Sequence, residues 1–187
     1  MTPRELEEFR ELRATVRERG TARIWVFVAG MIGWAGLTIA TASLAALPVA
    51  TFLPLLILAL TFEAVFSLHV TVERVGRYIQ VFLEDEEGRR GWEHVAMAVA
   101  PPLKGTSVDP LFTAYFVIAV FLNTGPALLA QPLLPVEAGA VLAAHVIVIV
   151  RILLARGIAS RQRAADLKRF TELKGTGSVA SSVSRGQ

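Results

Sequence analysis

The chain has no cysteine, and long parts of it contain no lysine or arginine. All nineteen basic residues fall within residues 1–23, 71–110 and 151–187. Without cysteine, disulfide bonds, thiol catalysis and cysteine-ligated zinc are excluded. The stretches between the basic segments are long enough to cross a lipid bilayer. This segregation of positive charge predicts an integral membrane protein, since translocated loops lack lysine and arginine.

The sequence also lacks the short motifs that mark common catalytic and ligand sites. It contains no nucleophile elbow, phosphate-binding loop, HExxH motif or dinucleotide fingerprint. No Glu-x-x-His repeat is present to hold a di-metal centre in a helical bundle. His69 and His145 differ in expected depth by about 12 Å, which is too much for opposing haem ligands. We therefore expect a protein that is not an enzyme and that has no cofactor or metal.

The dominant feature that is present is apolar sequence. Hydrophobic residues make up 53% of the chain and the mean hydropathy is +0.53, which exceeds the usual range of a soluble domain. Four runs approach the roughly 20 apolar residues that cross the hydrocarbon core. The predicted spans are residues 24–47, 51–70, 111–130 and 136–155. They are expected to be helices, because a single segment in lipid must satisfy its own backbone polar groups.

The connecting segments predict the orientation of these spans. The turns at 48–50 and 131–135 are short and have no basic residue, so they should face outward, leaving both termini and loop 71–110 in the cytoplasm. The predicted fold class is all-α: an integral membrane four-helix bundle of two antiparallel helical hairpins, with amphipathic cytoplasmic helices. The excess of arginine over lysine suggests a GC-rich bacterial genome, so the expected location is a bacterial inner membrane.

The predicted domain organisation follows from the same boundaries. Residues 1–23 should form an amphipathic cytoplasmic helix that begins with a capping box from Thr2 to Glu5. Residues 24–174 form the membrane domain with its cytoplasmic loop, in which a short helix is expected at 92–99. The Gly/Ser-rich tail 175–187 is predicted to be disordered.

A face of small residues lies within the first span. Gly30, Gly33, Gly36 and Ala40 recur at helical spacing, and small residues let helix backbones approach closely in lipid. Three interpretations stay open from the sequence: tight packing inside one bundle, a contact between copies of the chain, or a pore lining.

Apart from Glu137 at one end of the fourth span, two charged residues lie inside the predicted spans. Glu63 and Arg151 each lie about 20 Å from the outer surface, counted at 1.5 Å per residue. Their common depth predicts an ion pair between the second and fourth spans, and the stripe that Arg151 shares with Ala140 and Ile147 suggests that it points inward. The alternatives are an ion-binding or proton-binding acid in a transport path, or a protonated Glu63 beside a snorkelling Arg151.

Further polar residues should lie at mid-membrane depth. His145, Asn123 and Thr124 are expected near the level of Thr38 and Thr41, where they could hydrogen-bond between helices or form a polar substrate or ion site. Pro126 cannot donate a backbone hydrogen bond, so a kink or break is predicted there. Broken helices mark binding sites in some transporters, and kinks also occur in inert membrane helices.

These features predict function only as classes. The leading hypothesis is a non-enzymatic membrane protein that acts by helix association, as an accessory or scaffold subunit or a membrane regulator. The alternative is an oligomeric small channel or transporter that uses Glu63, His145 and Arg151. The expected partners are the lipid bilayer, anionic lipid at the basic C-terminal segment, and other copies of the chain or a larger membrane complex. Nucleic acid is not expected, despite a pI of about 9.8, because the basic tail adjoins a membrane span.

Overall fold

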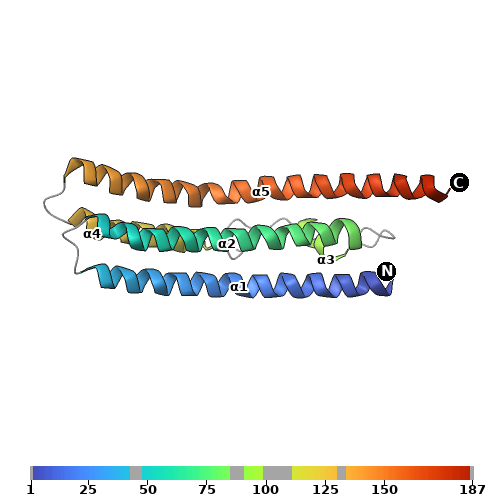
Figure 1. Ribbon diagram of the computed structural model, residues 1–187, viewed down its shortest axis with the longest axis horizontal. Coiled ribbons are helices and arrows are strands. Elements are labelled where there is room, and N and C mark those ends of the chain that lie inside the picture. The colour runs from blue at the N-terminus through green and yellow to red at the C-terminus, as the bar shows by residue number, and fades with distance from the viewer. Residues whose placement is uncertain (1, 43–47, 85–90, 99–110, 130–133, 186–187) are drawn as a thin grey trace. The chain divides into compact units, whose positions relative to one another are not determined.

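The computed structural model is all-helical, and the residues that it describes contain no strand. It describes the whole chain except residues 1, 43–47, 85–90, 99–110, 130–133 and 186–187. Three long helices are labelled in Figure 1: α1 (Pro3–Ala42), α2 (Phe52–Tyr78) and α5 (Pro135–Arg185). The shorter elements are the 3₁₀-helix η1 (Pro48–Thr51), the π-helix η2 (Ile79–Leu83), α3 (Trp92–Ala98) and α4 (Thr113–Leu129).

The first helix begins at the predicted capping box. The backbone N–H of Thr2 donates to Oε2 of Glu5, and the N–H of Glu5 donates to Oγ1 of Thr2 at 3.3 Å. The hydrogen bond from the Thr2 backbone also lowers the pKa of the Glu5 carboxyl. Pro3 fits the first helical position because its missing N–H would have no partner there. These contacts confirm the predicted start of the helix.

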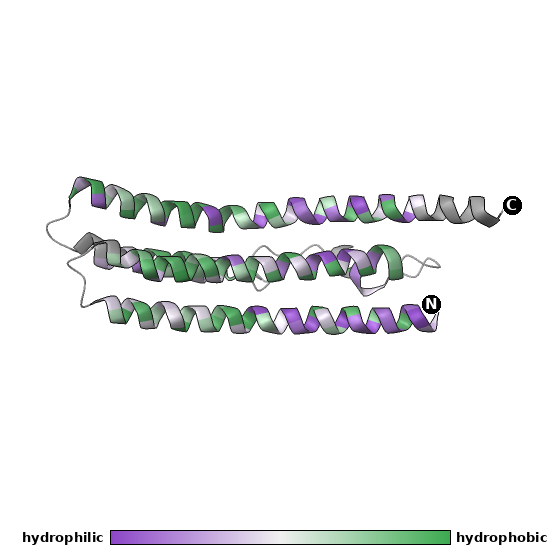
Figure 2. Cartoon of the chain, in the orientation of Figure 1, coloured by the Kyte–Doolittle hydropathy of each residue, from purple (hydrophilic) through white to green (hydrophobic). Residues whose placement is uncertain are grey.

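Three helices are long and apolar enough to cross a membrane, judged by length and composition. They are α1, the continuous stretch Phe52–Leu83, and α5. In Figure 2, α1 and α5 each change along their length between a mostly hydrophobic part and a mostly hydrophilic part. The change explains why helices of 40 and 51 residues exceed the roughly 20 residues that a bilayer requires. The chain is therefore a helical membrane protein.

The predicted third span corresponds to a shorter helix. α4 has 17 residues, or about 25 Å at 1.5 Å per residue, and it is apolar but shorter than the other candidates. α4 begins at Thr113, after the predicted start of the span at residue 111. Phe112 has a positive φ of 51°, which does not fit a right-handed helix. The carbonyl of Phe112 accepts the N–H of Phe116. The predicted cap at 109–110 lies outside the described residues.

Contacts divide the chain into two units, a division that the sequence analysis did not predict. The apolar unit contains the described residues of 21–68 and 109–157. The polar unit contains the described residues of 1–20, 69–108 and 158–187. Each long helix contributes residues to both units. The predicted N-terminal helix, middle loop and C-terminal extension are thus parts of one structure.

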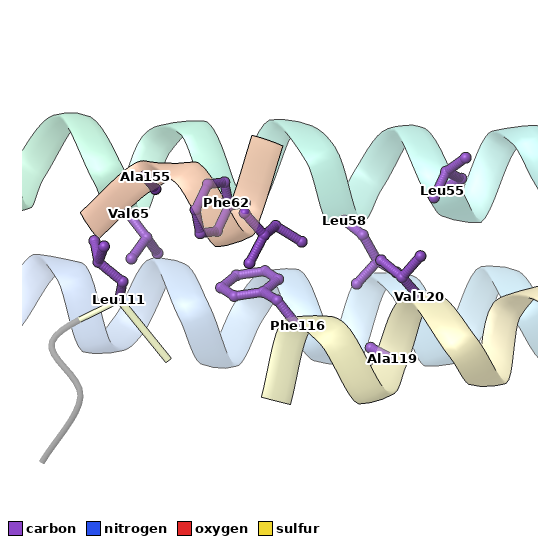
Figure 3. Close-up of a cluster of buried hydrophobic side chains, with 10 residues drawn as sticks. Leu55, Leu58, Phe62, Val65, Leu111, Phe116, Ala119, Val120 and Ala155 are labelled. Atoms are coloured by element: carbon purple, nitrogen blue, oxygen red, sulfur yellow. The ribbon is translucent and has the colours of Figure 1, made fainter. Parts of the chain in front are cut away.

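The apolar unit has a core built from three helices, drawn in Figure 3. The ring of Phe116 packs edge-on against Phe62 at a centroid distance of 5.2 Å, and α1 adds Phe27, which contacts Phe116 at 5.5 Å. These edge-to-face contacts fix the relative rotation of the helices more tightly than aliphatic side chains would. The buried members of the core are Leu55, Leu58, Phe62, Val65, Leu111, Phe116, Ala119, Val120, Ile152 and Ala155.

The polar unit has a small aromatic centre and an unusual helix end. The rings of Tyr78, Phe82 and Phe170 pack together with centroid distances of 4.8–6.1 Å. Beyond α2 the chain widens into the π-helix η2, where Lys174 of α5 donates to the carbonyl of Val81 at 2.7 Å. Gly88, a residue type that favours the end of a helix, lies outside the described residues.

The C-terminal segment differs from the prediction of a disordered tail over 175–187. α5 continues through Arg185. Glycine and serine are weak helix formers, which motivated the prediction. Extending an existing helix fixes only one residue for each hydrogen bond gained, whereas starting one costs much more. Because α5 is already helical and packed at Phe170, adding further helical turns after it requires no new nucleation.

Candidate functional site

The predicted small-residue face of α1 begins with an internal contact. A Cβ atom on Gly30 would lie 2.7 Å from the Cβ of Thr61 on α2, and closer still to its Cγ2 and Oγ1. Thr61 is buried and branched at Cβ, so it has little freedom to move away. Gly30 therefore serves packing between α1 and α2 inside the apolar unit.

The rest of this face is open. A Cβ on Gly33 would meet Ile57 at an ordinary contact distance of 3.8 Å, and a Cβ on Gly36 would have nothing within 4 Å. Gly33, Gly36 and Ala40 are all exposed. The four residues that the sequence grouped together thus divide between an internal contact and an outward surface.

Glu63 of α2 and Arg151 of α5 form a two-point ion pair. Nε of Arg151 lies 2.8 Å from Oε1 of Glu63, and Nη2 donates to Oε2 at 2.8 Å. Parallel hydrogen bonds of this kind are the geometry that guanidinium and carboxylate groups favour. The structure thus joins the two side chains that the depth count placed at the same level.

The ion pair lies at the surface of the apolar unit. The Glu63 side chain is 47% exposed and that of Arg151 is 33% exposed. The inner side of the guanidinium lies over the Phe66 ring, with 4.6 Å from its carbon to the ring centroid. The stripe that suggested an inward direction for Arg151 is mixed, because Ala144 packs against the core whereas Ile147 is 68% exposed. Residue spacing along α5 predicted the depth of Arg151, but it could not predict which side of the helix packs against the other helices.

Asn123 is the centre of a buried polar network. Its Nδ2 donates to the backbone carbonyl of Thr51 at 3.0 Å and lies 3.0 Å from Nε2 of His145. Its Oδ1 accepts the indole N–H of Trp34 at 3.2 Å. Asn123 and His145 are each 1% exposed. One side chain therefore connects α1, η1, α4 and α5, and the amide uses both donors and its acceptor.

The network fixes the protonation pattern of His145. Nδ1 lies 2.8 Å from the carbonyl oxygen of Val141, which only accepts, so Nδ1 carries a proton. Nε2 then accepts the second N–H of Asn123. The geometry is that of a structural histidine with both nitrogens satisfied.

The remaining predicted polar residues act within their own helices. The hydroxyl groups of Thr38, Thr41 and Thr124 donate to the carbonyls of Trp34, Leu37 and Val120, each four residues earlier. Among the described residues, these three hydroxyl groups form no hydrogen bond between helices, which was one of the roles considered for them. Pro126 lies inside α4, which continues to Leu129, so the predicted kink stays a prediction.

The polar unit contains an ionic cluster that sequence reasoning missed. The buried carboxylate of Glu84 accepts the backbone N–H groups of Glu93 and His94 at 3.0 and 3.1 Å, which caps the start of α3. Arg13 of α1 pairs with Glu93 at 2.9 Å. Gly91 permits this approach, since a Cβ there would lie 2.7 Å from Oε1 of Glu84. In the sequence, the acidic run at 84–87 favours a solvated charge cluster, with divalent-cation binding as the alternative, and neither predicts this cap.

Two groups of this unit have shifted pKa values, and both lie beyond the apolar stretch 51–70. Burial lowers the pKa of Arg77, and the nearby carboxylates of Glu73 and Glu93 oppose that effect. The hydrogen bond from the Tyr78 hydroxyl to Glu8 raises the pKa of Tyr78, with a smaller contribution from burial. Both shifts reflect packing among α1, α2 and α3.

α2 and α5 are also joined by ion pairs in the polar unit. Nε of Arg74 lies 3.1 Å from Oδ2 of Asp166, and Arg163 pairs with Glu73 at 2.5 Å. The pair of Arg163 with Glu73 neutralises part of the positive charge of the C-terminal segment. Among the described residues, no group of three or more His, Asp or Glu side chains could hold a metal ion.

No protein-family model, curated protein or solved structure matches this chain. Function must therefore be inferred from the contacts described above.

Proposed function

We propose that this chain is a non-enzymatic integral membrane protein that acts by helix association, as an accessory or scaffold subunit or a membrane regulator. In this proposal α4 also crosses the membrane, as the third of four spans, and the four spans form a bundle of two antiparallel hairpins. Both termini lie in the cytoplasm of a bacterium whose inner membrane holds the protein. The absence of basic residues from 43–50 and 130–135 supports this orientation.

The observation that carries the proposal is the open part of the α1 surface. Gly36 is exposed and a Cβ there would touch nothing, while Gly33 and Ala40 lie exposed on neighbouring turns. In lipid, apolar side chains gain nothing by leaving the acyl chains, so helices associate where small residues permit close approach. Because Gly30 already satisfies the internal contact with Thr61, the outer glycines remain available to another helix.

The alternative of an oligomeric channel or transporter has less support. Its candidate residues divide into two groups with separate partners: Asn123 bonds with His145, and Glu63 pairs with Arg151. The first group is buried and fully hydrogen-bonded, so binding a substrate or ion would require breaking it. The second group lies at the surface. Flux through proteoliposomes that is abolished by Glu63→Gln and His145→Ala would favour transport instead.

Contact with anionic lipid is part of the proposal. Arg163 and Lys174 of α5 are engaged within the polar unit, whereas the side chains of Arg161, Lys168 and Arg169 are exposed. Exposed basic side chains on the cytoplasmic side of a span are attracted to anionic headgroups, by roughly 1 kcal/mol each near the surface.

Purification of the tagged full chain from native membranes in a mild detergent tests the proposal. We expect a co-purifying membrane protein whose recovery falls at least about tenfold in Gly36→Leu, because the added side chain fills the approach surface. Gly139→Leu is the matched control, since Gly139 is also an exposed glycine with open space in an apolar helix. A lone monomer, or equal losses in both variants, would contradict the proposal.

A further inference from the structure

The half-exposed ion pair of Glu63 and Arg151 poses a problem that the apolar unit alone does not solve. Hydrocarbon offers no hydrogen-bond donor or acceptor, so a charged group facing lipid is unstable unless protein or water covers it. The rings of Phe66 and Phe62 lie 4.6 and 5.8 Å from the guanidinium carbon, yet the Arg151 side chain is still 33% exposed and that of Glu63 is 47% exposed. At about 20 Å from the outer surface, the pair lies well inside the apolar stretch.

The surroundings of the pair form a regular seam. On α2, Leu53, Leu56 and Leu60 are 51–58% exposed and precede Glu63 at alternating intervals of three and four residues. This is the spacing of the contact positions of a coiled coil. On α5, Ile147 and Leu154 flank Arg151 at the same intervals and are 68% and 58% exposed.

We propose that the occupant of this surface is a second copy of the chain, related by a two-fold axis along the membrane normal. The inference rests on the proposed function of helix association and adds a second surface, on α2 and α5, that is separate from the open face of α1. Adjoining positive and negative groups are self-complementary under two-fold rotation, so Glu63 of each copy faces Arg151 of the other. Two copies inserted in the same direction also place their ion pairs at the same depth.

The seam explains why this surface combines leucines with charge. Leucine side chains pack equally well against lipid or another helix. They therefore provide a complementary surface for the second copy but little free energy of association. The charged pairs supply the specificity, since a four-membered ring of alternating charges satisfies groups that lipid leaves exposed. The ion-pair site is therefore incomplete in one chain and complete in two.

A charge exchange tests the inference without breaking the pair inside each chain. The double variant Glu63→Arg/Arg151→Glu keeps an internal ion pair, and its thermal unfolding in detergent should match that of the original chain. Copies of this variant should associate with one another. When it is mixed with the original chain, like charges meet across the axis, so capture of one by the other should fall at least about tenfold.

Cross-linking locates the contact independently. The chain has no cysteine, so Leu60→Cys introduces a single thiol, and oxidation of native membranes should yield a disulfide-linked dimer. The matched control is Ile118→Cys, because Ile118 is 57% exposed on α4 and lies on another helix of the apolar unit. The control should stay monomeric under the same oxidation.

The possible failures are distinguishable. If the double variant and the original chain associate with each other as well as each does with itself, the surface is wrong while association by the proposed function stands. If single-molecule counting in vesicles finds only monomers, the pair is covered by lipid or by a different protein and the inference is overturned. If no co-purifying partner is found in addition, the proposed function fails as well.

Discussion

Gly30 and Thr61 approach so closely that no side chain larger than hydrogen fits at position 30. A Cβ atom there would lie 2.7 Å from the Cβ of Thr61. The contact holds α1 against α2 within the apolar unit. Gly36, on the same predicted face, has only open space around it. One motif in the sequence therefore has two physical roles.

Gly30→Ala should destabilise the apolar unit, since α1 must move outward or Thr61 must shift from a buried position. Overpacking of a well-packed contact costs about 1–3 kcal/mol. The measurement is the thermal unfolding midpoint of the purified chain in detergent. Gly33→Ala is the control, because a Cβ there meets Ile57 at 3.8 Å, and its midpoint should change little. Equal effects of the two variants would refute the packing role of Gly30.

Asn123→Leu should be among the most destabilising single substitutions in the apolar unit. It leaves the indole N–H of Trp34, the carbonyl of Thr51 and Nε2 of His145 without their partner. An orphaned buried polar group costs about 1–3 kcal/mol. Detergent-denaturation curves followed by helical circular dichroism measure the loss.

Thr124→Val provides the control for this network on the neighbouring residue. The Thr124 hydroxyl bonds only to the Val120 carbonyl of its own helix, so its removal should change stability by less than about 0.5 kcal/mol. A stable Asn123→Leu variant would show that the network contributes little to the fold.

Glu84→Ala should loosen α3, because the carboxylate caps the backbone N–H groups of Glu93 and His94. Loss of a helix cap costs about 0.5–2 kcal/mol, and a seven-residue helix has little other support. Amide hydrogen exchange over residues 91–98 should accelerate several-fold. Glu18→Ala changes an exposed acid on α1 and should leave that exchange rate unchanged.

The titration of Tyr78 tests the contact between α1 and α2 in the polar unit. The hydrogen bond to Glu8 raises its pKa, so the neutral phenol adds stability below about pH 10 that is lost as the pH rises through the folded value. The chain has two tyrosines, so Tyr115→Phe isolates the absorbance of Tyr78. Adding Glu8→Gln should lower the observed pKa. An unchanged titration curve would place Glu8 away from the phenol.

The sequence alone determined that the chain is helical and belongs in a membrane. Long apolar runs without basic residues leave few other structures for the backbone, because lipid offers it no hydrogen-bond partners. The capping box at Thr2 and the common depth of Glu63 and Arg151 were also readable, since helix geometry converts residue number directly into axial position. The membrane crossing by α4, the orientation and the function stay predictions from the same patterns.

Only the tertiary structure decided which way each side chain faces. A residue count gives height along a helix, but rotation about the helix axis depends on packing against neighbours from distant parts of the chain. For this reason the sequence did not show that the Arg151 guanidinium lies over Phe66 while its ion pair stays partly exposed, and it treated Gly30 and Gly36 alike. It could not anticipate that Trp34 and Thr51 complete the hydrogen bonds of Asn123, because those partners come from two segments far from Asn123 in the sequence.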